Sequence, residues 1–396
     1  MPHQLRIALQ SLVLLLSGIG LFLSSWIIIP APTMFLLTLG VGAPEVCHWL
    51  LVLNGVTSLV VLVGMRRTKL RRLALGASLL GLFLSALPLV QLPGTQQRMQ
   101  VAIGEALGRE YIAPIPRDRT WRSQPFVLAD AFRGIDPSES RYTSGIRFAI
   151  AEGVPLSMDI YRPPQVGKYP ALVVIYGGAW RSGNPANNAN FNRYMAARGY
   201  TVFAIDYRHT PWHRFPAQLE DVRTALEFIR QHGAEYEADL ERMVLLGRSA
   251  GAHLAMLAAY QPDALPVRAV VSYYGPVNLT EGYAHPPFPD PIDTRAVLEA
   301  FLGGSPDKLP DLYRVASPIS YVKRPLPPTL LVHGSRDSVV QFKYAQQMYK
   351  RLRAIGNTAV LLEIPWAEHA FDAIFQGPSN QLALYYTERF LAWALR

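Results

Sequence analysis

The segment VLLGRSAGAHLAML, residues 244–257, places Ser249 between two glycines that each lie two positions away. Small residues at Gly247 and Gly251 allow a sharp turn where a run of β-forming residues meets a helix-compatible run. In a G-x-S-x-G sequence the serine occupies a strained strand-to-helix corner, where larger flanking side chains would collide. The pattern therefore predicts an exposed hydroxyl near the positive end of a helix, suited to act as a nucleophile.

A serine in this role needs a general base, because an alcohol is a poor nucleophile at neutral pH. The chain order serine, acid, histidine limits the base to the downstream histidines, which are His253, His285, His333 and His369. His253 lies four residues along the serine's own helix and would point away from the hydroxyl. His285 lies in a proline-rich stretch, and His333 ends a predicted strand. His369 lies between the last predicted strand and the last predicted helix, where a loop can carry an imidazole over Ser249, so we predict His369 as the base.

The partner of this imidazole is predicted from the segment LLVHGSRDSVV, in which Asp337 follows a predicted strand. A carboxylate there can accept a hydrogen bond from the second ring nitrogen, which fixes the tautomer and stabilises the imidazolium. Glu368 and Asp372 flank His369 too closely in sequence to reach its ring easily. Asp337 is therefore the predicted acid.

Stabilisation of a negative oxygen is predicted from the segment YGGAWRSG, residues 176–183. Backbone N–H groups in a glycine-rich turn after a strand can converge on a developing oxyanion. The predicted donors are Gly177 and Gly178, together with Ala250, the residue after the serine.

These residues need a scaffold, and residues 141–396 supply an alternating β and α pattern. Several strands are continuous apolar runs, typical of a parallel sheet covered by helices on both faces. The sequence therefore predicts an α/β protein with a doubly wound, mostly parallel sheet, interrupted by a proline-rich, cap-like excursion at about 275–325. Strands are predicted at 145–150, 155–161, 171–176, 200–205, 242–246, 268–273, 328–333 and 359–364. Helices are predicted at 187–198, 217–232, 251–260, 340–354 and 381–395.

The chain before residue 94 has a different composition. Three uncharged apolar runs, at about 7–29, 47–64 and 73–92, are each long enough to cross the hydrocarbon core of a bilayer. The first run is too long for a signal peptide and lacks a cleavage-site pattern after it. We predict an all-α transmembrane region over 1–93 with three spans, followed by a connector at 94–140.

The loops around these runs predict an orientation. The sequence RRTKLRR at 66–72 holds five basic residues, and Arg6 precedes the first run, whereas 30–46 has no Lys or Arg. Basic loops remain on the cytoplasmic side. The prediction is an integral membrane protein whose N-terminus is cytoplasmic and whose domain 141–396 is on the non-cytoplasmic side, periplasmic or extracellular.

The composition bears on partners and cofactors. The net charge of +9 is concentrated in the apolar segment, which points to a membrane flank and not to nucleic-acid binding. Cys47 is the single cysteine, so an intrachain disulfide and a cysteine-based zinc site are excluded. Phosphate-loop and dinucleotide fingerprints are absent from the sequence, and we expect no cofactor and no metal.

Taken together, residues 141–396 resemble an α/β-hydrolase of the esterase/lipase type, close to bacterial carboxylesterases with an HGGGW-like motif. GRSAG matches the serine elbow, HGSRDSVV and EHAF match the acid and base segments, and Asp206-Tyr207-Arg208 with FPAQLEDV matches a structural stretch between them. The resemblance implies a serine hydrolase that cleaves small-molecule carboxylic esters through an acyl-enzyme on Ser249.

The sequence departs from this family at Tyr176, which stands where histidine is usual, and at Ala179, which stands at the third glycine. We expect the bulk of Tyr176 to restrict the acyl pocket and to favour short acyl groups. Amide or formamide hydrolysis and acyl transfer would use the same residues, and a catalytically silent binding module would use the same fold. The sequence leaves these alternatives open.

Overall fold

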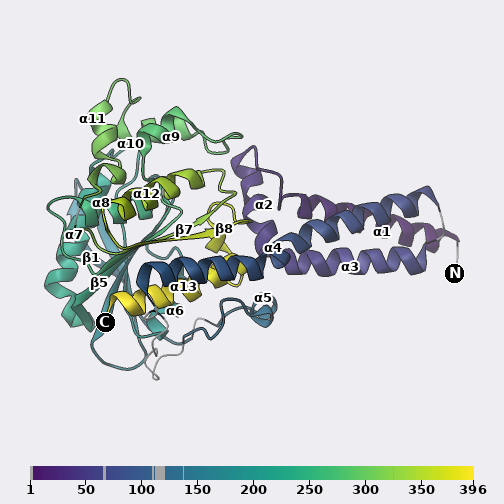
Figure 1. Ribbon diagram of the computed structural model, residues 1–396, viewed down its shortest axis with the longest axis horizontal. Helices are drawn as coiled ribbons and strands as arrows, with labels where there is room; N and C mark the ends of the chain where they lie inside the picture. The colour runs from purple at the N-terminus through teal and green to yellow at the C-terminus, as the bar shows by residue number, and fades with distance from the viewer. Residues whose placement is uncertain (1–2, 66–67, 109–110, 112–120, 137, 324) are drawn as a thin grey trace.

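The computed structural model describes residues 1–396 except 1–2, 66–67, 109–110, 112–120, 137 and 324. An elongated helical bundle projects from an α/β body, and the N-terminus lies at the far end of the bundle (Figure 1). The helices before the sheet are α1 (His3–Ser25), α2 (Met34–Glu45), α3 (Cys47–Gly64), α4 (Lys69–Leu107) and α5 (Leu128–Arg133).

The body is built on one eight-stranded sheet in the order β1-β2-β4-β3-β5-β6-β7-β8. β1 pairs antiparallel with β2 and β2 antiparallel with β4, whereas the remaining neighbours are parallel. The predicted mostly parallel sheet is thereby confirmed. The strands are β1 (Arg141–Ala151), β2 (Val154–Arg162), β3 (Tyr169–Ile175), β4 (Thr201–Ile205), β5 (Ala238–Arg248), β6 (Ala269–Tyr273), β7 (Thr329–Gly334) and β8 (Ala359–Ile364).

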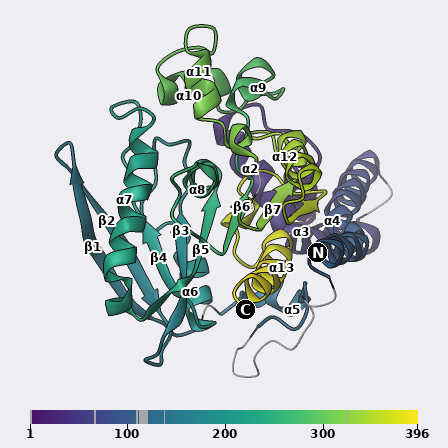
Figure 2. The same ribbon diagram turned by 60° about the vertical axis from the view of Figure 1, so that its left-hand side comes forward.

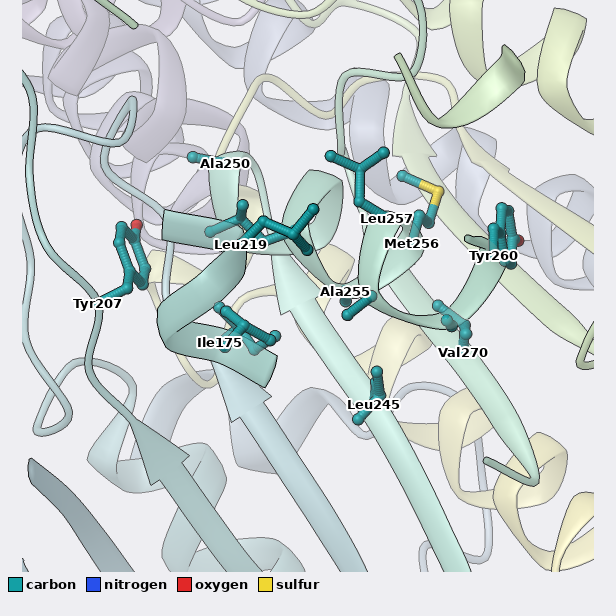
Figure 3. Close-up of a cluster of buried hydrophobic side chains, with 14 of the residues drawn as sticks. Ile175, Tyr207, Leu219, Leu245, Ala250, Ala255, Met256, Leu257, Tyr260 and Val270 are labelled. Carbon is teal, nitrogen blue, oxygen red and sulfur yellow. The ribbon is translucent and has the colours of Figure 1, made fainter. Parts of the chain in front are cut away.

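Helices cover both faces of this sheet (Figure 2). Along β3, Val173 belongs to the apolar core under one set of helices, while Leu172 and Val174 belong to the core on the opposite face, as expected because side chains alternate along a strand. The first face packs on α7 (Ala217–His232), α8 (Ala250–Tyr260) and α12 (Phe342–Ala354), and the second on α6 (Ala189–Ala197), α13 (Pro378–Ala394) and the end of α4. Figure 3 shows part of the first core, which includes Met256 and Leu257 of α8 and Val270 of β6.

All eight predicted strands and all five predicted helices of the body are present, with ends shifted by up to four residues. The proline-rich excursion forms three short helices above the sheet (Figure 1). They are α9 (Leu279–Ala284), α10 (Thr294–Leu302) and α11 (Pro310–Val315), and short 3₁₀ turns occur at Gly233–Tyr236, Pro318–Tyr321 and Phe371–Ala373.

Helix α4 is much longer than the apolar run that predicted it. It has 39 residues in all and ends at Leu107, although Pro88 and Pro93 lie within it. The predicted boundary between the third span and the connector, at residues 93 and 94, therefore falls inside this helix. The extension is explained by Met99, Ile103 and Leu107, which follow each other at helical spacing and are buried in the second core of the sheet. The same helix therefore belongs to the bundle at one end and to the body at the other.

The interior of the bundle of α1, α3 and α4 holds small and polar residues beside apolar ones such as Val13, Val61 and Leu84, and its exterior carries large apolar side chains. Asn54 of α3 lies at its centre, where its amide donates to Ser24 Oγ of α1 at 3.0 Å. A side chain at Gly20 of α1 or at Gly81 of α4 would overlap Asn54. Ser58 Oγ and Ser78 Oγ are hydrogen-bonded at 2.9 Å. Exposed apolar side chains include Leu15, Phe22, Val56, Leu59, Val63, Leu73 and Phe83.

Among the described residues, α3 and α4 are long and apolar enough to cross a membrane, a criterion that a buried core helix or a signal sequence also meets. In the most apolar 18-residue stretch of each helix, 39% of α3 and 33% of α4 is buried within the protein. Most of each stretch is therefore exposed. The first predicted span corresponds to α1, where the apolar helical stretch Gln10–Ser25 is shorter. Three crossings therefore remain a prediction.

The junction between β5 and α8 is the most crowded turn of the body. Ser249 adopts φ 51° and ψ −121°, a left-handed conformation that L side chains rarely take. A Cβ at Gly251 would overlap the carbonyl oxygens of Ile175 and Tyr176, and one at Gly247 would overlap the backbone of Gly251. The prediction of a strained serine on a central strand is confirmed.

Substitution of Gly251 by alanine tests this crowding. Because the added methyl group meets two fixed carbonyl oxygens, we expect Gly251→Ala to lower the thermal midpoint of the full chain in detergent by about 4–10 °C. Gly282→Ala is the matched control, since no atom lies within 4 Å of the added Cβ. Equal midpoints for the two variants would show that the close approach does not constrain the turn.

Candidate active site

Three side chains from separate loops meet at the carboxyl edge of the sheet. His369 follows β8, Asp337 follows β7, and Ser249 follows β5. His369 Nε2 lies 2.9 Å from Ser249 Oγ, and His369 Nδ1 lies 2.8 Å from Asp337 Oδ2. The three residues singled out from the sequence therefore form one hydrogen-bonded chain, although each comes from a different part of the polypeptide.

Asp337 is held as a buried carboxylate by several donors. Its Oδ1 accepts from the N–H groups of Val339 at 2.9 Å and Val340 at 2.7 Å, and His333 Nε2 lies 3.1 Å from Oδ2. Burial alone would raise the pKa of Asp337, but His369 and His333 together hold that pKa well below its usual range. The carboxylate is thus charged and fixed in direction.

Two opposing effects act on the pKa of the His369 imidazole. Burial disfavours its charged form, but the neighbouring Asp337 carboxylate outweighs this and raises the pKa of His369 above its ordinary value. Glu368 accepts from the N–H groups of His369 at 2.8 Å and Ser338 at 2.6 Å. Glu368 thereby ties the loop of the base to the loop of the acid. Burial and then the charge of Asp337 raise the pKa of Glu368 to about 7.

The glycine turn lies directly against the serine. A Cβ at Gly177 would be 2.8 Å from the Arg248 carbonyl oxygen and 3.0 Å from Ser249 Cβ. Gly178 has φ 131° and Ala179 has φ 52°, so the turn uses backbone conformations that a side chain rarely permits. Ala250 is the first residue of α8, and N–H groups at a helix start have no partner within the helix. Gly177 and Ala250 therefore adjoin Ser249, and Gly178 borders the same hollow as the serine.

Tyr176 contradicts the expectation of a restricted acyl pocket. Its ring is buried against Tyr207, at 4.4 Å between centroids, and its hydroxyl donates to Asp206 at 2.5 Å. The ring contributes to neither hollow beside Ser249, and a Cβ at Gly183 would overlap it. The Tyr176 ring therefore packs against the glycine-rich turn at Gly183, on the side away from the two hollows. It does not narrow the space available to an acyl group.

Two hollows meet at Ser249. The first, with about 610 Å³ of empty space including adjoining solvent, is mostly apolar and is walled by the excursion through Val277, Leu279, Val297 and Leu298. The second, with an empty volume of about 880 Å³, contains His369 and the polar side chains of Arg181 and Asn188. Met34 and Leu37 of α2 also border the second hollow. An extended substrate can therefore reach Ser249 with parts of different polarity on its two sides.

The remaining histidines have other surroundings. His253 is buried, where its Nδ1 accepts from Trp180 Nε1 at 3.2 Å and its Nε2 lies 2.6 Å from the carbonyl oxygen of Ala316. His285 lies at the rim of the apolar hollow. His333 Nε2 contacts the Asp337 carboxylate. The sequence did not predict this contact, because the position of His333 indicated only the end of a strand. Among the described residues, no group of three or more His, Cys, Asp or Glu side chains could hold a metal.

The chain is similar to several known proteins. Residues 158–352 match the BD-FAE family model. The esterase LipC of Mycobacterium tuberculosis is 35% identical over 254 residues, which cover 59% of this chain and 61% of LipC. The probable carboxylic ester hydrolase LipM of the same organism is 30% identical over 253 residues, covering 59% of this chain and 57% of LipM.

A solved structure shares the fold. The butyrate-bound structure of a Thermogutta terrifontis esterase, Est2, is 27% identical, with a TM-score of 0.52 over 64% of this chain and 93% of that one. The matched part of the chain spans less than two thirds of the curated relatives LipC and LipM. The resemblance to α/β-hydrolases of the esterase type is confirmed, and this chain is similar in sequence and fold to carboxylic ester hydrolases.

Proposed function

We propose that the chain is a membrane-anchored serine hydrolase that cleaves carboxylic esters through an acyl-enzyme on Ser249. The observation that carries the proposal is the hydrogen-bonded chain from Ser249 Oγ through His369 to Asp337, at 2.9 and 2.8 Å. A strained serine beside a histidine, with a buried carboxylate behind it, is the arrangement that makes an alcohol nucleophilic.

The chemistry follows from the positions of these groups. Ser249 Oγ attacks the ester carbonyl carbon while its proton passes to His369 Nε2, and the carbonyl oxygen becomes an oxyanion. The N–H groups of Gly177, Gly178 and Ala250 stabilise that oxygen. His369 then protonates the departing alcohol, which leaves an acyl-serine. Water attacks this acyl group with His369 as base, and the carboxylic acid and free Ser249 are released.

The relatives support this reaction class. LipC and LipM bear the names esterase and probable carboxylic ester hydrolase. Another solved structure, 26% identical with a TM-score of 0.53, is Thermogutta terrifontis esterase 2 phosphonylated by sarin. An organophosphonate is therefore a suitable probe for this chain.

Membrane anchoring is proposed from the bundle. Its apolar exterior and the small and polar residues within its interior suit a lipid environment, where helices pack through small residues and interhelical hydrogen bonds. We take α1, α3 and the first half of α4 as three spans. The basic loop and the N-terminus are then cytoplasmic, and the α/β body is on the non-cytoplasmic side.

The nucleophile is tested by Ser249→Ala. The variant should fold, should lose labelling by a fluorophosphonate probe, and should lower kcat for p-nitrophenyl butyrate by at least about 1000-fold, because triad members act as one unit. Ser335→Ala is the matched control, since this hydroxyl bonds Glu363 at the surface. Near-normal turnover by Ser249→Ala would exclude the mechanism.

The pH profile tests the pair of Asp337 and His369. The base must be neutral, so kcat/KM should fall as pH drops through a His369 pKa that is raised above its ordinary value. Asp337→Asn removes the charge that stabilises the imidazolium while burial remains, so the acid limb should move to lower pH. The maximal rate should also fall about 10³–10⁴-fold. The exposed Asp311→Asn is the control, and an unmoved acid limb in Asp337→Asn would contradict the assignment.

The orientation is tested by fusions at the C-terminus. Alkaline phosphatase, which needs an oxidising compartment, should be active there, and a fluorescent protein that matures only in the cytoplasm should stay dark. The reverse pattern would put the body inside the cell and would mean that one of the three helices does not cross.

A further inference from the structure

Helix α2 links the bundle to the candidate active site. It lies across the end of the bundle that faces the α/β body (Figure 1). Met34 and Leu37 border the hollow that also contains Ser249 and His369. A segment from the N-terminal region, more than 200 positions from the serine in sequence, therefore forms part of the wall of the site.

Specific contacts fix α2 in this position. Thr33 caps its start by accepting from Leu36 N at 3.3 Å. At its other end the carboxylate of Glu45 accepts from Ser379 N at 3.0 Å and Ser379 Oγ at 2.5 Å. The Arg336 guanidinium donates to the Ile28 carbonyl in the segment before the helix. The segment around α2 is thus bonded to the loop that carries Asp337 and to the start of α13.

The large exposed side chains of this region are apolar. Met34 is 57% exposed and Phe35 81% exposed, and Ile28 and Ile29 next to them are also exposed. The one formal charge between residues 30 and 46 is Glu45, which is buried against Ser379. Exposed apolar side chains also cover α1, α3 and α4, and α2 lies at the end of their bundle (Figure 1), so lipid that covers the bundle would meet α2 at that end.

We propose that α2 lies in the membrane interface and that Met34 and Leu37 form the wall over which substrate reaches Ser249. The substrate class is an amphipathic ester with a long apolar chain, taken from the lipid surface. This inference rests on the proposed function, both the Ser249 hydrolase and its anchoring.

The shape of the site fits such a substrate. The apolar hollow on the other side of Ser249 presents Leu279, Val297 and Leu298 to part of a hydrocarbon chain, and contact of its CH₂ groups with these side chains is favourable. The polar side chains of Arg181 and Asn188 in the second hollow can face a headgroup. Tyr176 borders neither hollow, so its side chain does not block the binding of a substrate with a long acyl chain.

Met34→Asp tests the role of α2 in the full chain reconstituted in phosphatidylcholine vesicles. Two substrates are compared, namely soluble p-nitrophenyl butyrate and p-nitrophenyl dodecanoate incorporated in the vesicles. A charge on the apolar wall should reduce kcat/KM for the vesicle-bound ester by about tenfold or more, and for butyrate by less than about threefold. Met34→Leu, the conservative variant, keeps the wall apolar and should restore most of the vesicle-bound rate that Met34→Asp loses.

Val166→Asp is the matched control. Val166 is 81% exposed but precedes β3, at the opposite edge of the sheet from Ser249, so both rates should equal those of the wild type. Met34→Ala, which shortens the side chain without adding charge, should give the same selective loss to a smaller degree. It serves as the readout if the thermal midpoint shows that Met34→Asp does not fold.

The outcomes separate the two proposals. If the wild type hydrolyses butyrate through Ser249 but not the vesicle-bound ester, or if the Met34 variants lower both rates equally, the role of α2 is overturned and the hydrolase remains. If the wild type hydrolyses neither ester and Ser249 is not labelled by a fluorophosphonate, the proposed function fails and this inference fails with it.

Discussion

The left-handed backbone of Ser249 is the constraint on which the site depends. A non-glycine residue at φ 51° and ψ −121° is unfavourable and persists only when the surroundings hold it. Its N–H donates to the Tyr273 carbonyl at 2.9 Å, and its carbonyl accepts from His253 N at 3.1 Å. β5, which ends at this residue, lies in the middle of the sheet with parallel neighbours on both sides. The stability of the sheet therefore supports the strain at the serine.

The second requirement is electrostatic, because a buried carboxylate is costly unless it is paired and hydrogen-bonded. Asp337 satisfies this requirement with two imidazoles and with the N–H groups of Val339 and Val340. His333 Nε2 lies 3.1 Å from Asp337 Oδ2 and 2.7 Å from the Val340 carbonyl oxygen, whereas His369 is the imidazole that faces Ser249. Glu368 fixes the backbone between them. The acid, the base and the loops that carry them thus form one cooperative unit.

Local sequence patterns predicted those features of the fold and the candidate site that are determined by residues close together in the sequence. The strands of the sheet are short apolar runs, and the serine, acid and base each follow one of them, so their meeting at the carboxyl edge could be foreseen. The extent of α4 could not, because the stripe formed by Met99, Ile103 and Leu107 has meaning only against the sheet that it covers. The orientation of Tyr176 was also missed, since its hydroxyl is directed by Asp206, which lies 30 residues away.

The contribution of α2 was beyond sequence reasoning for a related reason. A 12-residue apolar segment is too short to span a bilayer and offers no chemistry of its own, so its position follows entirely from tertiary contacts. Those contacts are reinforced by α4, whose 39 residues extend about 58 Å at 1.5 Å per residue. Because one helix runs from the bundle into the core of the body, the angle between the two is set by packing and not by a flexible linker. The hollow at Ser249 therefore lies beside α2, at the end of the bundle where α4 continues into the body.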